Sequence, residues 1–96
     1  MTMYIEVQDK SLLNIDDYAF YNCYSYNTNS GTDQTLVWDI YIITEGSGSV
    51  NAKDTSFEVS DSGNVINIYT NNEGLKAVAT AAHNRNNNIT VTQITI

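Results

Sequence analysis

The sequence contains no proline, one cysteine and only four lysine or arginine residues among its 96 amino acids. A single thiol closes no internal disulfide, and thiolate metal sites need several cysteines, so Cys23 supports neither. No apolar run approaches the roughly 20 residues of a membrane-spanning helix, and Met1–Glu6 lacks the features of a signal peptide. We therefore expect a soluble intracellular protein, located in the cytoplasm, or in the host-cell cytoplasm if the protein is viral.

Acidic residues outnumber basic ones by eleven to four, which gives a formal net charge of −7 and a pI near 4.1. This charge disfavours direct binding to nucleic acid or to an anionic membrane, and it favours a partner protein with a basic surface. The same charge also serves ordinary solubility. We expect a protein partner, no nucleic acid and no membrane, with homo-oligomer formation left open.

Length and apolar content predict one folded domain that spans residues 1–96. Hydrophobic residues make up 42% of the chain, which supplies enough apolar surface to offset chain entropy. Alternating or continuous apolar patterns predict strands, and turn-forming residues between them predict hairpins. The expected strands are Thr2–Gln8, a hairpin of Asp17–Asn27 with Thr35–Thr44, a hairpin of Ser56–Ser60 with Val65–Thr70 around residues 61–64, and a final edge strand Ile89–Ile96.

One helix is expected after the second hairpin. Thr70 and Glu73 have the spacing of a capping box, and apolar residues follow with helical periodicity. His83 and Arg85 place positive charge near the helix C-terminus, where Asn84 or Asn86 can adopt the left-handed conformation that ends a helix. The periodic apolar positions are Leu75, Val78, Ala79 and Ala82.

These elements predict an α+β domain in which a small antiparallel sheet of about five or six strands carries one helix on a face. Thr35–Thr44 is apolar at nearly every position, which indicates burial on both faces and a central place in the sheet. The alternative is an all-β sandwich, in which Leu75–Ala82 is a loop or strand.

No catalytic motif is visible. Cys23 and His83 could form a nucleophile and base only if folding brought them together, and a buried thiol beside a helix-capping histidine is the simpler interpretation. The carboxylates match no known catalytic or metal-binding spacing, and residues 61–64 offer only a fragment of a calcium loop. We expect a protein that is not an enzyme and that binds no cofactor and no metal.

The distinctive feature is seven tyrosines and one tryptophan beside an excess of carboxylates. Tyrosine and tryptophan supply large contact areas in recognition surfaces, although they also fill the cores of small sheets. In Asp17–Asn27, strand alternation places Tyr18, Phe20, Tyr24 and Tyr26 on one face. The predicted partner-binding residues are Asp16, Asp17, Tyr21, Tyr24, Tyr26, Asp33 and Asp39.

Three functions of different classes fit these observations. The first is a non-catalytic binding protein, for example a phage-type or toxin-antitoxin-type inhibitor that covers a basic, nucleic-acid-contacting surface of its partner. The second is a structural or assembly subunit of a virion or tail, associating through its edge strand. The third is a carbohydrate-binding module, against which the apolar neighbours of Trp38 argue, since they predict a core position.

Overall fold

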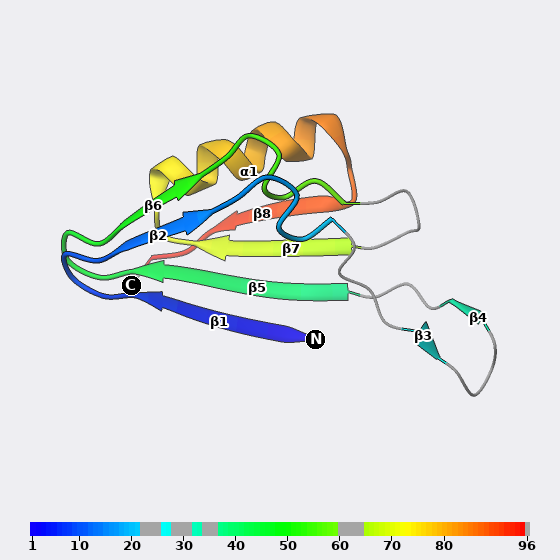
Figure 1. The fold of residues 1–96 in the computed structure, drawn as a ribbon, viewed down its shortest axis with the longest axis horizontal. Helices are drawn as coiled ribbons and strands as arrows, with labels where there is room; N and C mark the ends of the chain where they lie inside the picture. Colours follow the sequence, from blue (N-terminus) through cyan, green and yellow to red (C-terminus); the bar gives the residue numbers. More distant parts are fainter. Residues whose placement is uncertain (22–25, 28–31, 34–36, 60–64, 96) are drawn as a thin grey trace.

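The computed structural model describes residues 1–21, 26–27, 32–33, 37–59 and 65–95, with main chain alone for residues 26–27 and 32–33. Within this part of the chain, no helix combines the length and apolar character that crossing a membrane requires. Figure 1 shows a sheet with further strands and a helix lying over it. The elements are β1 (Thr2–Val7), β2 (Leu12–Ile15), β3 (Tyr26–Asn27), β4 (Thr32–Asp33), β5 (Val37–Thr44), β6 (Ser49–Ala52), β7 (Val65–Thr70), α1 (Glu73–Arg85) and β8 (Ile89–Gln93).

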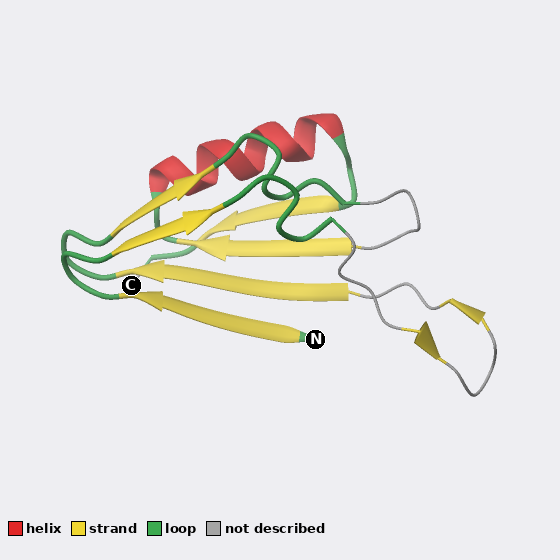
Figure 2. Ribbon diagram, viewed as in Figure 1, coloured by secondary structure: helices red, strands yellow, loops and turns green. Residues whose placement is uncertain are grey.

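The main sheet contains four parallel strands in the order β1-β5-β7-β8 (Figure 2). The expected antiparallel sheet is therefore wrong, although the combination of strands with one helix is correct. β5 pairs with β1 on one side and β7 on the other, which confirms the central place of the apolar segment. The expected burial on both faces is wrong for the first part of the strand, where Val37 is exposed and Asp39 and Tyr41 are half-buried.

Two turns carry the chain out of the main sheet into a second layer. Residues 8–11 lead from β1 to β2, and residues 45–48 lead from β5 to β6. Each strand–turn–strand unit forms an arch, and the two arches stack because β1 pairs with β5 while β2 pairs with β6, both in parallel. The pair β2–β6 and helix α1 lie over the same face of the main sheet (Figure 2).

A carboxylate joins the two stacked turns. The main-chain N–H and the hydroxyl of Ser47 donate to Asp9 Oδ1 over 2.8 and 2.9 Å, and these bonds hold the pKa of Asp9 below its ordinary value. Gly46 lies beside this carboxylate with φ +55°, and a Cβ at Gly46 would come within 2.4 Å of Asp9 Oδ1. The stacking of the arches therefore requires glycine at this position.

Gly46→Ala is expected to lower the free energy of unfolding by at least about 1–2 kcal/mol, because alanine is strained at this φ and its methyl group displaces Asp9. The matched control is Gly74→Ala in α1, where the added Cβ meets nothing closer than 3.4 Å. That control should stabilise the protein by up to about 1 kcal/mol. Urea denaturation measures both effects, and equal effects of the two substitutions would contradict the role of Gly46.

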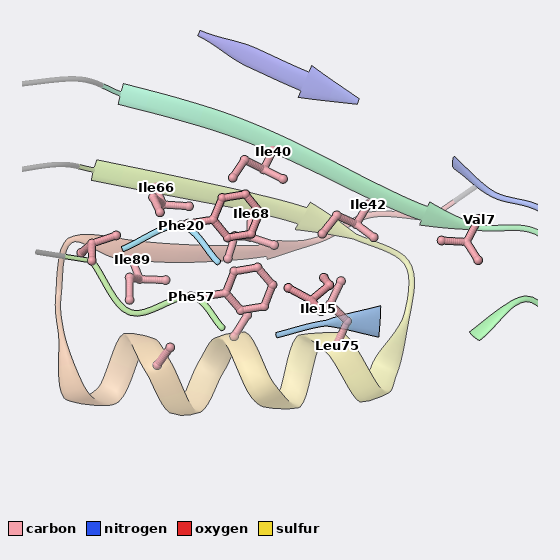
Figure 3. Packing of buried hydrophobic residues seen from close by; sticks show 13 residues of the cluster. Val7, Ile15, Phe20, Ile40, Ile42, Phe57, Ile66, Ile68, Leu75 and Ile89 are labelled. Atoms are coloured by element: carbon pink, nitrogen blue, oxygen red, sulfur yellow. The ribbon is translucent and has the colours of Figure 1, made fainter. Parts of the chain in front are cut away.

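The core lies between the main sheet and the second layer (Figure 3). Isoleucines at alternate positions of the main sheet point towards α1. The residues of α1 that face them are those expected from its periodicity, and of these only Val78 is half-buried rather than buried. Phe20 and Phe57 stack in the middle of the cluster, with ring centroids 5.6 Å apart. The buried apolar residues are Val7, Ile15, Phe20, Ile40, Ile42, Phe57, Val59, Ile66, Ile68, Leu75, Ala79, Ala82 and Ile89.

Helix α1 is confirmed, but its capping differs from the prediction. Asn72 is the N-cap, and its side-chain oxygen accepts a hydrogen bond from the Leu75 N–H over 2.9 Å. Thr70 instead ends β7, where its buried hydroxyl donates to the Ile42 carbonyl over 2.7 Å. At the other end, Asn86 has extended rather than left-handed backbone angles, and its N–H donates to the Ala82 and His83 carbonyls.

Asn72→Ala should lower the free energy of unfolding by about 1 kcal/mol, since the Leu75 N–H loses its acceptor. Asn72→Asp is the control, because it keeps an oxygen at the same place and should retain most of the stability. Thermal unfolding followed by circular dichroism at the helix band gives the comparison. An equal loss in the aspartate variant would show that capping is not the reason.

Both predicted hairpins are wrong. Residues 17–21 form turns, and the antiparallel pair is the short β3–β4, whereas β5 pairs only with parallel neighbours in the main sheet. Residues 54–57 also form turns, and β7 pairs in parallel with β5 and β8. Segments 12–17 and 45–54, which lie between the expected strands, contribute the strands β2 and β6. Ile89–Gln93 is an edge strand, as expected.

Candidate functional site

The face of the main sheet opposite the core carries no described helix or strand, and we call it the outer face. Side chains on this face alternate with the buried isoleucines of β5 and β7. Towards the end of β5 this side of the sheet is not accessible to solvent, because Ile43 is only 2% exposed. The outer face consists of Thr2, Tyr4, Glu6, Val37, Asp39, Tyr41, Val65, Asn67, Tyr69, Thr90 and Thr92.

Three tyrosines from neighbouring strands form a ladder across the outer face. The parallel register aligns Tyr4 of β1, Tyr41 of β5 and Tyr69 of β7 in one row. The Tyr4 and Tyr41 ring centroids are 5.8 Å apart, and the Tyr41 and Tyr69 centroids are 4.5 Å apart with nearly parallel planes. Stacked rings stabilise the sheet and present a continuous aromatic surface with phenol groups.

Asp39 lies beside this ladder and is its main polar contact. Its Oδ1 atom accepts a hydrogen bond from Asn67 Nδ2 over 3.0 Å and one from the Tyr69 hydroxyl over 3.5 Å. Burial raises the pKa of Tyr69, and the charges of Asp39 and Tyr41 and the hydrogen bond to Asp39 raise it further. The Tyr69 phenol is therefore held neutral as a hydrogen-bond donor.

The ionisable side chains of the outer face, apart from its tyrosines, are all acidic. They are those of Glu6 and Asp39, and the outer face contains no lysine or arginine. The four lysine and arginine side chains lie elsewhere. Lys10 lies in the turn between β1 and β2, Lys53 follows β6, and Lys76 and Arg85 belong to α1. The side chains of the outer face thus combine stacked tyrosines with carboxylates, and the Met1 ammonium group, which donates to the Val37 carbonyl over 2.8 Å, lies at one end of it.

The structure divides the predicted partner-binding residues between different surfaces. Asp39 lies on the outer face, whereas Asp16, Asp17 and Tyr21 lie in the turns that follow β2. Tyr26 and Asp33 belong to β3 and β4, whose side chains are outside the description. Tyr24, like Cys23, lies outside the described residues, so the predicted strand face of aromatic residues is untested there.

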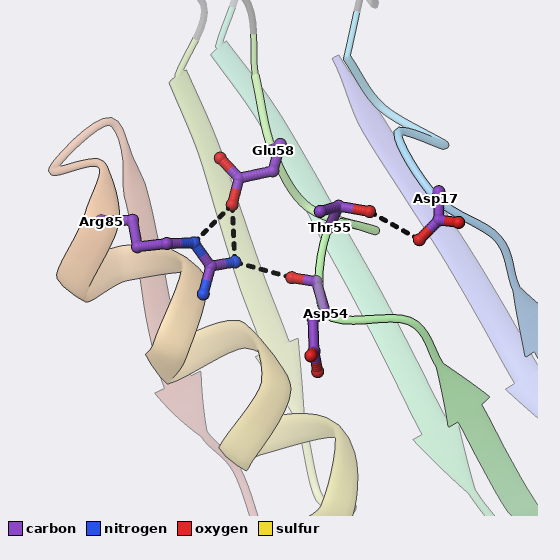
Figure 4. Close-up of polar contacts among 5 residues, drawn as sticks. All are labelled: Asp17, Asp54, Thr55, Glu58 and Arg85. Atoms are coloured by element: carbon purple, nitrogen blue, oxygen red, sulfur yellow. Dashed lines mark hydrogen bonds and ion pairs between the residues drawn. The ribbon is translucent and has the colours of Figure 1, made fainter.

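The turn at residues 16–21 forms a second, smaller tyrosine cluster. Asp17 accepts a hydrogen bond from the Thr55 hydroxyl over 2.6 Å, and the Tyr18 and Tyr21 rings meet edge to face 5.4 Å apart. Arg85 lies in the same region and contacts Glu58 and the Asp54 carbonyl, as Figure 4 shows. Asp17 and Arg85 both bond to the segment 54–58, so charges of both signs are present in this region.

Sequence reasoning missed the tyrosine ladder. Tyr4, Tyr41 and Tyr69 each stand between two residues that face the opposite side of their strand, in the triplets Met-Tyr-Ile, Ile-Tyr-Ile and Ile-Tyr-Thr. The repeated triplet is a signal that the three strands share one register. All three tyrosines lie in predicted strands, and none of them is among the predicted partner-binding residues.

Among the described residues, no three histidine, cysteine, aspartate or glutamate side chains lie close enough together to hold a metal ion. A shallow hollow of about 410 Å³ on the exposed side of α1 is lined by Glu73, Lys76 and small or polar residues. The His83 ring contacts the Ile89 carbonyl, which gives this histidine a structural role at the end of the helix.

Comparisons of the chain with models of protein families, with curated proteins and with solved structures found no match.

Asp39→Asn should lower the pKa of Tyr69, because it removes a negative charge that opposes ionisation of the phenol. Tyr69 contributes stability below the unfolded pKa near 10, and this contribution is lost as pH rises through the higher folded pKa. Titration of ring-labelled tyrosine by NMR measures the shift, with Tyr69→Phe assigning the signal. Asp16→Asn is the control that should leave the Tyr69 pKa unchanged.

Proposed function

We propose that the protein is a non-catalytic binding protein that docks a lysine- and arginine-rich protein surface onto its outer face. The observation that carries this proposal is a parallel sheet of which the described helix and strands cover one face only. Parallel sheets are typically covered on both faces, because their connections and partners bury each side. An uncovered parallel sheet with a row of tyrosines is therefore best explained as a surface that a partner covers.

The chemistry of the outer face favours a basic partner. Tyr4, Tyr41 and Tyr69 offer ring surfaces and hydroxyl groups to lysine and arginine side chains, and Asp39 and Glu6 offer carboxylates. The net charge of −7 steers the protein towards positive surfaces and raises the association rate. A protein of this kind acts as an inhibitor when the surface that it covers is one that contacts nucleic acid.

Carbohydrate binding has weaker support. Sugar rings stack on open aromatic faces, but the inner faces of the tyrosine ladder are occupied by neighbouring rings. Trp38, the other natural stacking platform, is half-buried and packs against the core, in agreement with the sequence interpretation. A binding partner that contacts the ladder from above, through cationic side chains, fits the geometry better.

The docking face can be tested with a short lysine- and arginine-rich peptide titrated into the labelled protein and followed by NMR. The largest amide shifts are expected in β5 and β7, and rising salt should weaken binding. Asp39→Asn should weaken affinity by up to about fivefold, since one exposed ion pair contributes up to about 1 kcal/mol.

Asp16→Asn is the matched control, because it changes the net charge equally but lies in the turn after β2. Its effect on affinity should be smaller than that of Asp39→Asn. Shifts concentrated at residues 16–21, or equal losses in both variants, would mean that net charge alone attracts the peptide. The outer face would then not be the docking site.

A further inference from the structure

The two edges of the main sheet are protected to different degrees. At β8, α1 lies alongside the strand, and Gln93 bonds to both Lys76 and Glu73 of the helix over 2.6 Å. At β1, no described strand or helix pairs with the open side. β1 is six residues long and contains neither proline nor lysine, which are residues that commonly prevent edge strands from pairing with other chains.

The hydrogen bonds of β1 show which main-chain groups are open. The Asp39 N–H donates to the Met1 carbonyl over 2.8 Å, and the Glu45 N–H donates to the Val7 carbonyl over 2.9 Å. In a parallel ladder, residues alternate between bonding to one neighbour and to the other. The odd-numbered residues of β1 therefore bond to β5, and Thr2, Tyr4 and Glu6 direct their N–H and C=O groups to the open side.

We propose that β1 pairs antiparallel with β1 of a second copy of this chain, about a two-fold axis that passes beside Tyr4. In this arrangement Tyr4 faces Tyr4 of the other copy, and Thr2 faces Glu6 of the other copy. Each facing pair exchanges two main-chain hydrogen bonds, because all three residues direct these groups outward. No like charges stand opposite one another, since Glu6 is the only charged residue of β1.

Side chains on both faces of β1 fit this pairing. Tyr4 ends the tyrosine ladder and is 60% exposed, so Tyr4 of the second copy extends the ladder across the axis. On the inner face, half-buried Met3 faces Ile5 of the other copy. Beside Ile5, a hollow of about 220 Å³ runs along the arch, and Leu12 at its rim is 59% exposed. Because a two-fold axis relates the two copies, each copy contributes the same surface residues to the contact.

Cysteine crosslinking tests the register in a Cys23→Ser background. Tyr4→Cys should form a disulfide-linked dimer under mild oxidation, because facing residues of such a pair lie about 5.5 Å apart at Cα, within the disulfide range. Thr2→Cys is the control: its two copies would lie about 13 Å apart along the strands, so it should not crosslink. The double variant Thr2→Cys/Glu6→Cys should crosslink again.

Sedimentation over a range of protein concentrations tests the dimer without oxidation. Thr2→Glu should raise the dissociation constant of the dimer about tenfold, because it places two carboxylates opposite each other on both sides of the axis. Adding Glu6→Lys to Thr2→Glu should restore dimer formation, since opposite charges then face each other. Circular dichroism checks that each variant is folded.

Three results would overturn the proposal: a folded wild-type protein that stays monomeric at all concentrations, Thr2→Cys that crosslinks as readily as Tyr4→Cys, or open-ended oligomers instead of a dimer. Open-ended growth would indicate pairing of β1 with β8 of the next copy. These outcomes are separate from peptide binding to the outer face, which is measured on Asp39.

Discussion

Parallel strand direction obliges the chain to return to the starting end of the main sheet after every strand. Here all three returns pass over the same face: one through β2, one through β6 and one through α1. The two hydrogen bonds that Ser47 donates to Asp9 hold the first two returns together. As a result one face of the sheet receives the whole core, and the opposite face and the first strand's edge receive no cover from the described elements.

Individual elements could be predicted from sequence because their signals are local. The period of Leu75, Ala79 and Ala82 identifies α1, and the apolar run of β5 identifies a central strand. Strand direction could not be predicted in the same way. Turn-forming residues such as Gly46 indicate only that the chain bends, and the bend leads into a second layer instead of back along the same sheet. The alternation of apolar residues along a strand is the same whether the strand pairs in parallel or antiparallel.

The candidate site depends on register, and this explains why Asp39 is the one predicted residue with a described side chain that belongs to the outer face. Tyr4, Tyr41 and Tyr69 lie far apart in sequence, and they become neighbours only when β1, β5 and β7 are aligned. Asp16 and Asp17 are consecutive carboxylates, which is why the sequence suggests them as partner-binding residues, but the fold places them in the turn that follows β2. In the proposed dimer, two outer faces would join into one continuous surface.

The order of strands in the main sheet follows the order of the chain, and this has a consequence for how the protein is made. During synthesis β1 emerges first and has no partner until residues 37–44 have emerged, and each later strand then adds to the most recently formed edge. Growth therefore proceeds in one direction, from β1 towards β8. None of the described strands adds to the other side of β1, so this edge is accessible to a neighbouring nascent chain while the later strands are still being added.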